Sequence, residues 1–112
     1  MIKALSIQVQ PHLAKGLDVH AIQAACEELA KTPLVVRHNF DHGHDKVHYF
    51  NFTFGTDDLP ALWREIQLRL YSDPQLAQAM AEASMAMCEG SHGWDDYLLL
   101  YHFDSSVKRD AL

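Results

Sequence analysis

The sequence predicts an α+β fold, because segments with two-residue hydrophobic alternation lie between segments with helical periodicity. Their order along the chain is strand, helix, strand, strand, helix, helix, strand. This order is typical of the ferredoxin-like split βαβ arrangement, in which an antiparallel sheet carries its helices on one face. The 112 residues are 48% hydrophobic and contain no internal repeat or linker, so we expect one ferredoxin-like domain over residues 1–112, with a polar tail at 105–112.

The first strand and helix follow from periodicity and from the residues that interrupt it. From Lys3 to Gln10, apolar side chains alternate with small or polar ones, which predicts a half-buried strand. Pro11 and Gly16 bracket a loop, and Asp18 is placed to cap a helix that ends before Pro33. The apolar stripe of this helix consists of Val19, Ile22, Cys26 and Leu29.

Two runs rich in β-branched and aromatic residues, Leu34–Phe40 and Lys46–Phe54, predict a hairpin. The five residues between them would form its loop, with Gly43 at the centre. The register of this hairpin cannot be read from the sequence, but a loop of that length would pair Phe40 with Lys46.

Two helices and a last strand are predicted in the C-terminal half. The run Thr56-Asp57-Asp58 begins a helix whose apolar face is Leu59, Leu62, Trp63, Ile66 and Leu70. Pro74 begins a second helix, which closes at Gly90 and carries Leu76, Met80, Ala83 and Met87. From Asp96 to Asp104 we expect a strand with Leu98 and Leu100 in the core, and with Tyr97, Leu99, Tyr101 and Phe103 on the other face.

The charge of the chain is uneven. The formal net charge is −6, and residues 70–107 contain no Lys or Arg but six acidic residues, Asp73, Glu82, Glu89, Asp95, Asp96 and Asp104. Such a segment repels phosphates, so we do not expect nucleic-acid binding. It is either a solvated acidic face that aids solubility or a surface that captures a basic protein.

The two cysteines, Cys26 and Cys88, both fall in predicted helices and lack CxxC spacing. We therefore interpret them as reduced structural thiols. No apolar stretch approaches the length of a membrane span, so we expect a cytoplasmic protein with no membrane partner.

The sheet face without helices is predicted to be polar and aromatic at once. It would collect Ser6, Gln8, Arg37, Asn39, Tyr49, Asn51, Thr53, Tyr97 and Tyr101. Three interpretations fit: a homodimer interface, a small-ligand cavity between two such sheets, or a face covered by the C-terminal tail. In a ligand site Arg37 would bind an anion, while Tyr49, Asn51 and Tyr101 would orient the ligand.

Four of the eight histidines lie in the hairpin: His38, His42, His44 and His48. The predicted pairing places His38 opposite His48, with Cβ atoms about 5 Å apart, as groups for proton transfer. His42 and His44 flank Gly43 and are candidate ligands of a divalent transition metal, although no HExxH or CxxC framework accompanies them. The alternative is that His and Asp occur here because they tolerate turn geometry. No other cofactor is indicated.

Two functions from different classes remain. The first is a homodimer with a small-ligand site on the open sheet face and cofactor-free acid–base chemistry by His38 or His48. The second is a non-enzymatic acidic module, of an inhibitor or immunity-like kind, that recognises a basic protein partner.

Overall fold

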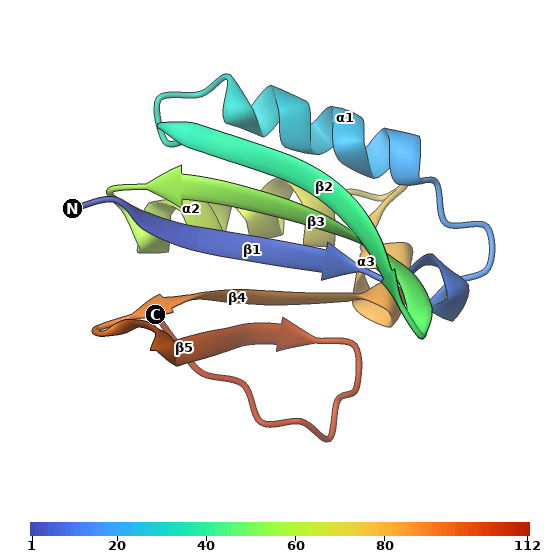
Figure 1. The fold of residues 1–112 in the computed structure, drawn as a ribbon. Coiled ribbons are helices and arrows are strands. Elements are labelled where there is room, and N and C mark those ends of the chain that lie inside the picture. Colours follow the sequence, from blue (N-terminus) through green and yellow to red (C-terminus); the bar gives the residue numbers. More distant parts are fainter.

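Five strands form one antiparallel sheet in the computed structural model, which describes all residues from Met1 to Leu112 (Figure 1). The strand order across the sheet is β2-β3-β1-β4-β5. The strands are β1 (Lys3–Val9), β2 (Arg37–Asp45), β3 (Val47–Thr56), β4 (Ser84–Gly90) and β5 (Gly93–His102). The α+β class with an antiparallel sheet is confirmed.

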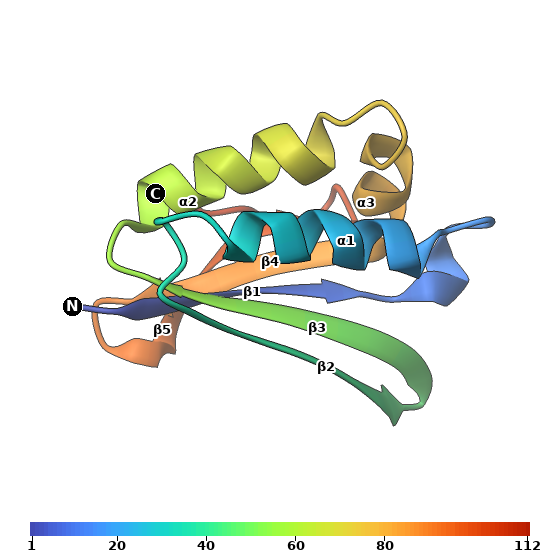
Figure 2. The same ribbon diagram turned by 90° about the horizontal axis from the view of Figure 1, so that it is seen from above.

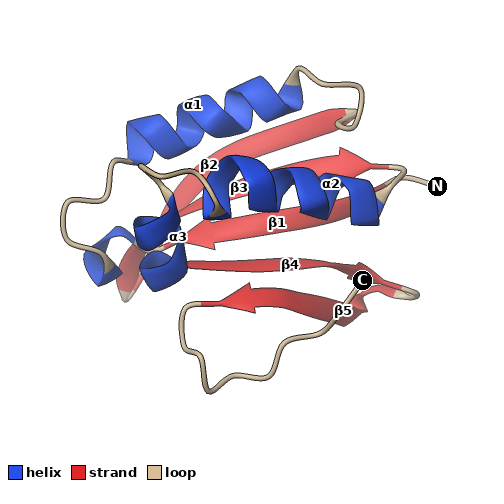
Figure 3. Ribbon diagram, turned by 180° about the vertical axis from the view of Figure 1, so that it is seen from behind, coloured by secondary structure: helices blue, strands red, loops and turns tan.

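All helices lie on one face of this sheet (Figures 2 and 3). They are α1 (Val19–Ala30), α2 (Leu59–Ile66), its continuation in a π-helical turn η2 (Gln67–Tyr71), and α3 (Ala77–Ala83), while a short 3-10 turn η1 (Pro11–Leu13) follows β1. The side chains of Asp18 and Asp58 cap α1 and α2, each accepting a bond of 3.1 Å from the backbone N–H three residues later. No helix is long and apolar enough to cross a membrane.

The core lies between this helix layer and the inner face of the sheet. Its fully buried side chains include Leu5, Ile7, Ile22, Phe52, Phe54, Leu62, Ile66 and Met80. They come from the alternating inward positions of β1 and β3 and from the apolar stripes of α1 and α2, as the periodicity predicts.

The segment 84–90 is a strand, and the prediction of a helix there is wrong. Apolar residues at 80, 83 and 87 fit a helical period, but residues 84 to 90 also alternate, with Ser84, Ala86, Cys88 and Gly90 all buried. These inward residues are small, which lets α3 and η2 pack closely above β4. The sheet therefore has five strands rather than four, and Cys88 lies in a strand.

The hairpin exists, but its predicted register is wrong. Phe40 pairs with Phe52 instead of Lys46, and the two strands continue until Asp45 pairs with Val47. Lys46 makes the turn with a φ of 66°, while Gly43 lies inside β2. The longer ladder pairs more backbone groups and keeps Phe40 against the core, where its ring lies 5.2 Å from that of Phe52.

The C-terminal tail folds back along β5. Asp110 bonds to Leu99 in both directions, its N–H donating to the Leu99 carbonyl at 2.7 Å and its carboxylate accepting from the Leu99 N–H at 2.9 Å. The Arg109 guanidinium lies 4.3 Å from the centre of the Tyr101 ring. The tail thus occupies backbone groups at one edge of the sheet and lies on the helix side (Figure 2).

Candidate ligand site on the open sheet face

The face opposite the helices is a polar surface with an apolar strip. At its centre the hydroxyl groups of Ser6 and Thr53 are 3.0 Å apart, on paired residues of β1 and β3. Next to Ser6 and Gln8, strand β4 presents Met85 and Met87, both half-buried. The C-terminal tail lies on the other side of the sheet, so it does not cover this face (Figure 2).

A hollow of about 160 Å³ lies on this face where β2, β3 and β1 meet. It is lined by Ala4, Arg37, His38, Asn39, Thr53 and Gly55. Arg37 pairs with Gly55, and a Cβ on Gly55 would approach Arg37 Cγ to 2.7 Å and Nε to 2.9 Å. The absence of a side chain at residue 55 therefore gives the arginine stem its place over β3.

Arg37 forms no ion pair. The salt bridges of this chain involve Lys31, Arg69 and His92 only. An exposed guanidinium with five donors and no carboxylate partner is free to bind an anion from solution.

Beyond the hollow, the Asp41 carboxylate accepts hydrogen bonds from two amide side chains of the open face. The donors are Asn39 Nδ2 at 3.2 Å and Asn51 Nδ2 at 3.4 Å. We did not predict a role for Asp41, although it has the same parity along β2 as Arg37 and Asn39. With its amide donating to Asp41, Asn51 retains its side-chain oxygen as an acceptor for a ligand.

Tyr49 lies on the open face as predicted, directly opposite Gly43. A Cβ on Gly43 would collide with the Tyr49 hydroxyl and ring. The tyrosine therefore lies flat over the backbone of β2, towards the hairpin end and away from the hollow.

Tyr101 does not belong to this face, which corrects the prediction. A register shift in the β4–β5 pairing at Ala86 and Met87 places Tyr101 opposite the inward-facing Ala86. Its hydroxyl donates to the Ala81 carbonyl at 2.8 Å, and its ring lies 4.8 Å from that of Tyr71. Tyr97 is half exposed on β5, as expected of an outward residue.

The four hairpin histidines lie on the helix side of the sheet, opposite to Arg37. His38 pairs with Phe54 and His48 with His44, so the predicted His38–His48 pair does not form. The structure instead brings the His42 and His48 rings to 5.7 Å. No group of three or more His, Cys, Asp or Glu side chains is arranged to hold a metal ion, so the geometry gives no metal centre at His42 and His44.

The two thiols are structural. Burial raises the pKa of Cys26 to about 12 and that of Cys88 to about 11, so both stay protonated and unreactive at neutral pH. Both cysteines are free and buried in the core.

Comparison with protein families, with curated proteins and with solved structures finds no match for this chain.

Proposed function

We propose that the chain forms a homodimer through its open sheet face and binds a small carboxylate there. The observation that carries the proposal is Arg37, an unpaired guanidinium held over Gly55 beside a hollow lined with polar groups. We further propose that β1 to β4 follow the split βαβ pattern, with β5 as an added edge strand.

The dimer is supported by the size and chemistry of the open face. Strands of seven to ten residues, spaced about 4.8 Å apart, present a face of roughly 24 Å by 23 Å. Side-chain relief raises its accessible area towards the ~800 Å² that each partner contributes to a standard interface. Met85 and Met87 supply an adaptable apolar strip in this face, and Ser6, Gln8 and Asn51 supply hydrogen-bonding groups.

The ligand class follows from the hollow. A bidentate guanidinium–carboxylate pair is planar and short, which suits an arginine whose stem is already confined. The hydroxyl of Thr53 and the oxygen of the Asn39 amide lie at the same hollow and can orient a second polar group, such as a carbonyl or hydroxyl. The volume of about 160 Å³ limits the ligand to a few heavy atoms per protomer.

Acid–base chemistry is not part of the proposal, because the histidines expected to perform it point to the helix side. His38 borders the hollow, but its ring lies 5.0 Å from Phe40 on the inner face. The proposed activity is therefore binding rather than catalysis.

The alternative function, capture of a basic protein by residues 70–107, has less support. Four of the six carboxylates accept backbone N–H groups of the chain itself: Asp73, Glu89, Asp96 and Asp104. These bonds cap turns and tie Glu89 to the start of β1, so the acidity of this segment has a structural cause without any partner.

Sedimentation velocity across the micromolar range tests the dimer. We expect Met87→Lys to dissociate it, because the substitution places a charge in the open face. Leu68→Lys, at an exposed residue on the helix side, leaves it intact. A wild-type chain that stays monomeric at every concentration contradicts the interface.

Amide NMR shifts during titration with pyruvate test the site independently. We expect shifts at Arg37, Asn39 and Thr53 that are lost in Arg37→Met and retained in Arg64→Met, a matched change at an exposed arginine of α2. Equal binding by the two variants would refute the assignment of Arg37.

A further inference from the structure

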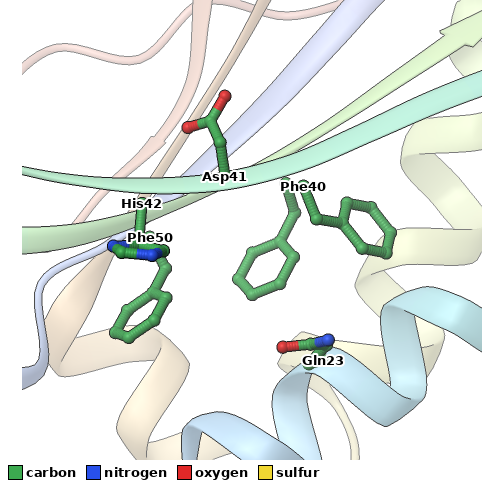
Figure 4. A pocket seen from close by; sticks show the side chains of 6 residues that line it. Gln23, Phe40, Asp41, His42 and Phe50 are labelled. Carbon is green, nitrogen blue, oxygen red and sulfur yellow. The ribbon is translucent and has the colours of Figure 1, made fainter.

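A second cavity lies on the opposite side of the sheet, between α1 and the β2–β3 hairpin (Figure 4). It has a volume of about 210 Å³ and is lined by Gln23, Phe40, Asp41, His42, Phe50 and Phe52. Sequence patterns do not predict this cavity, because its lining residues come from three separate segments of the chain. It shares none of these residues with the hollow at Arg37.

The cavity exists because the hairpin bends away from the helix layer towards its turn (Figure 2). The Phe52 side chain is buried beneath the helices, but Phe40 and Phe50, on the same face, remain only half-buried. From α1, the residue that faces them is Gln23, whose side chain is shown across the cavity from the rings in Figure 4. Two aromatic rings thus present surface to a space that the chain does not fill.

Two polar groups converge on this aromatic lining. The Gln23 amide donates one N–H to Glu27 Oε1 at 3.0 Å, which leaves its oxygen and its second N–H available. His42 stands at the other end, its ring 5.9 Å from that of Phe50 and 5.7 Å from that of His48. A ligand between them can stack on phenylalanine and form one or two directed hydrogen bonds.

The cavity has no fixed charge for a ligand to neutralise. No Lys, Arg or Glu lines it. Asp41 contributes to its wall, but Figure 4 shows the carboxylate pointing away from Gln23 and the rings, towards the open face where it accepts the bonds of Asn39 and Asn51. A charged ligand would lose its hydration here without gaining a counter-ion.

Size and chemistry together define the ligand. An apolar cavity of about 150 Å³ is large enough for benzene, so the present volume of about 210 Å³ accommodates one aromatic ring with one substituent. We infer that this cavity is a binding site for an uncharged single-ring aromatic compound that carries one hydrogen-bonding group, as phenol does. The aromatic group would stack on Phe40 and Phe50, and its polar group would bond to Gln23 or His42.

Titration of the isotope-labelled full chain with phenol, followed by amide NMR shifts, tests this site. We expect a Kd on the order of 1 mM, typical of a ligand with few heavy atoms, with the largest shifts at Gln23, Phe40, His42 and Phe50. Cyclohexanol has the same hydroxyl group but no aromatic ring, and benzoate has the ring but a charge. We expect each to bind several-fold more weakly than phenol.

The chain offers a matched pair of substitutions. Gln23 and Gln78 are both exposed helical glutamines that donate to a glutamate four residues later, at 3.0 Å and 3.1 Å. Gln23→Phe fills the cavity from α1 and should weaken phenol binding at least about tenfold, while Gln78→Phe on α3 should leave it unchanged. Gln23→Ala, a favourable helix substitution, removes the polar group and should reduce binding by a smaller factor without disturbing the fold.

Three results would overturn the inference. The first is the absence of phenol-induced shifts at the cavity residues of the wild-type chain. The second is equal phenol affinity in Gln23→Phe and Gln78→Phe. The third is binding of benzoate or of cyclohexanol as tight as that of phenol. Tight benzoate binding would show that the cavity does not exclude charge, and tight cyclohexanol binding would show that it does not select an aromatic ring.

Discussion

Ser84 joins α3 to β4, and its buried hydroxyl group links the Met80 carbonyl to the partly buried Tyr71 hydroxyl. Ser84 Oγ donates to the Met80 carbonyl at 2.6 Å, and its distance to the Tyr71 hydroxyl is also 2.6 Å. Because the serine proton is used on Met80, Tyr71 must be the donor to Ser84. Burial raises the pKa of Tyr71, which keeps this proton in place.

We predict that Ser84→Ala is strongly destabilising and that Tyr71→Phe rescues it. Ser84→Ala removes the hydrogen bonds of the serine hydroxyl and leaves the Tyr71 hydroxyl without an acceptor. Together these two effects should lower the free energy of unfolding by about 2–3 kcal/mol. Met80 keeps one partner, because the Ser84 backbone N–H also bonds to its carbonyl. Tyr71→Phe alone removes one hydrogen bond and leaves no buried donor without an acceptor, so it should lower the free energy of unfolding by about 1 kcal/mol. The double variant has no orphaned hydroxyl, so it should be more stable than Ser84→Ala by about 1 kcal/mol.

Urea denaturation of the four proteins in this cycle measures the free energies of unfolding. Tyr101→Phe is the control for the tyrosine change, because the Tyr101 hydroxyl donates to the Ala81 carbonyl and forms no hydrogen bond with Ser84. It should not rescue Ser84→Ala. Additive losses in the double variant would show that the hydrogen bond between Tyr71 and Ser84 is not formed.

Three further predictions concern the core, the tail and the ligand site. The free energy of unfolding should fall as pH rises above about 9, because Cys26 and Cys88 ionise in the unfolded chain near their ordinary pKa but remain protonated in the folded chain up to about 12 and 11. The loss approaches about 1.4 kcal/mol per thiol and pH unit, and denaturation at several pH values measures it. In Cys26→Ala, the loss between neutral and alkaline pH should be smaller than in the wild-type chain. Deletion of residues 105–112 removes the bonds to Leu99 and exposes the edge of β5, so chemical denaturation should show a loss of about 1–2 kcal/mol and light scattering should show more association; unchanged behaviour would mean that the tail is not docked. Gly55→Ala should displace Arg37, because the flexible stem of the arginine can move away from the new methyl group. Pyruvate binding should therefore become weaker, whereas the melting temperature should change little.

Much of the fold could be predicted because its signals are local. Asp18 caps α1 and Asp58 caps α2, and the strand from Lys3 is found where alternation predicts it. The strand 84–90 escaped prediction because its apolar residues satisfy a period of two and a period near 3.6 at once. The packing of helices above the sheet decides between strand and helix for this segment, because it requires small inward residues such as Ala86 and Cys88.

Hairpin register is the second point at which local signals fail. The loop was predicted around Gly43, because glycine is common in hairpin turns. The chain turns instead at Lys46, which adopts a positive φ although it is not a glycine. The choice is made by tertiary contacts: with Phe40 opposite Phe52, the Phe40 ring packs against the core, with its centre 5.2 Å from that of Phe52 and 5.6 Å from that of Phe54. No rule based on the turn sequence alone contains that information.

The errors in register and in strand count had unequal consequences for the site, and parity explains the difference. The partner of Phe40 moved from Lys46 to Phe52, a shift of six residues and therefore an even number. An even shift changes every partner but leaves each side chain on its face, so Arg37 and Asn51 remain on the open face as predicted. In the β4–β5 pairing, by contrast, one extra residue on β5 at the Ala86–Met87 step reverses the alternation and moves Tyr101 to the helix side. The face of a residue depends on parity, whereas its neighbours depend on register. This is why the place of Arg37 on the open face was predictable, whereas the close approach of the His42 and His48 rings and the aromatic cavity beside them were not.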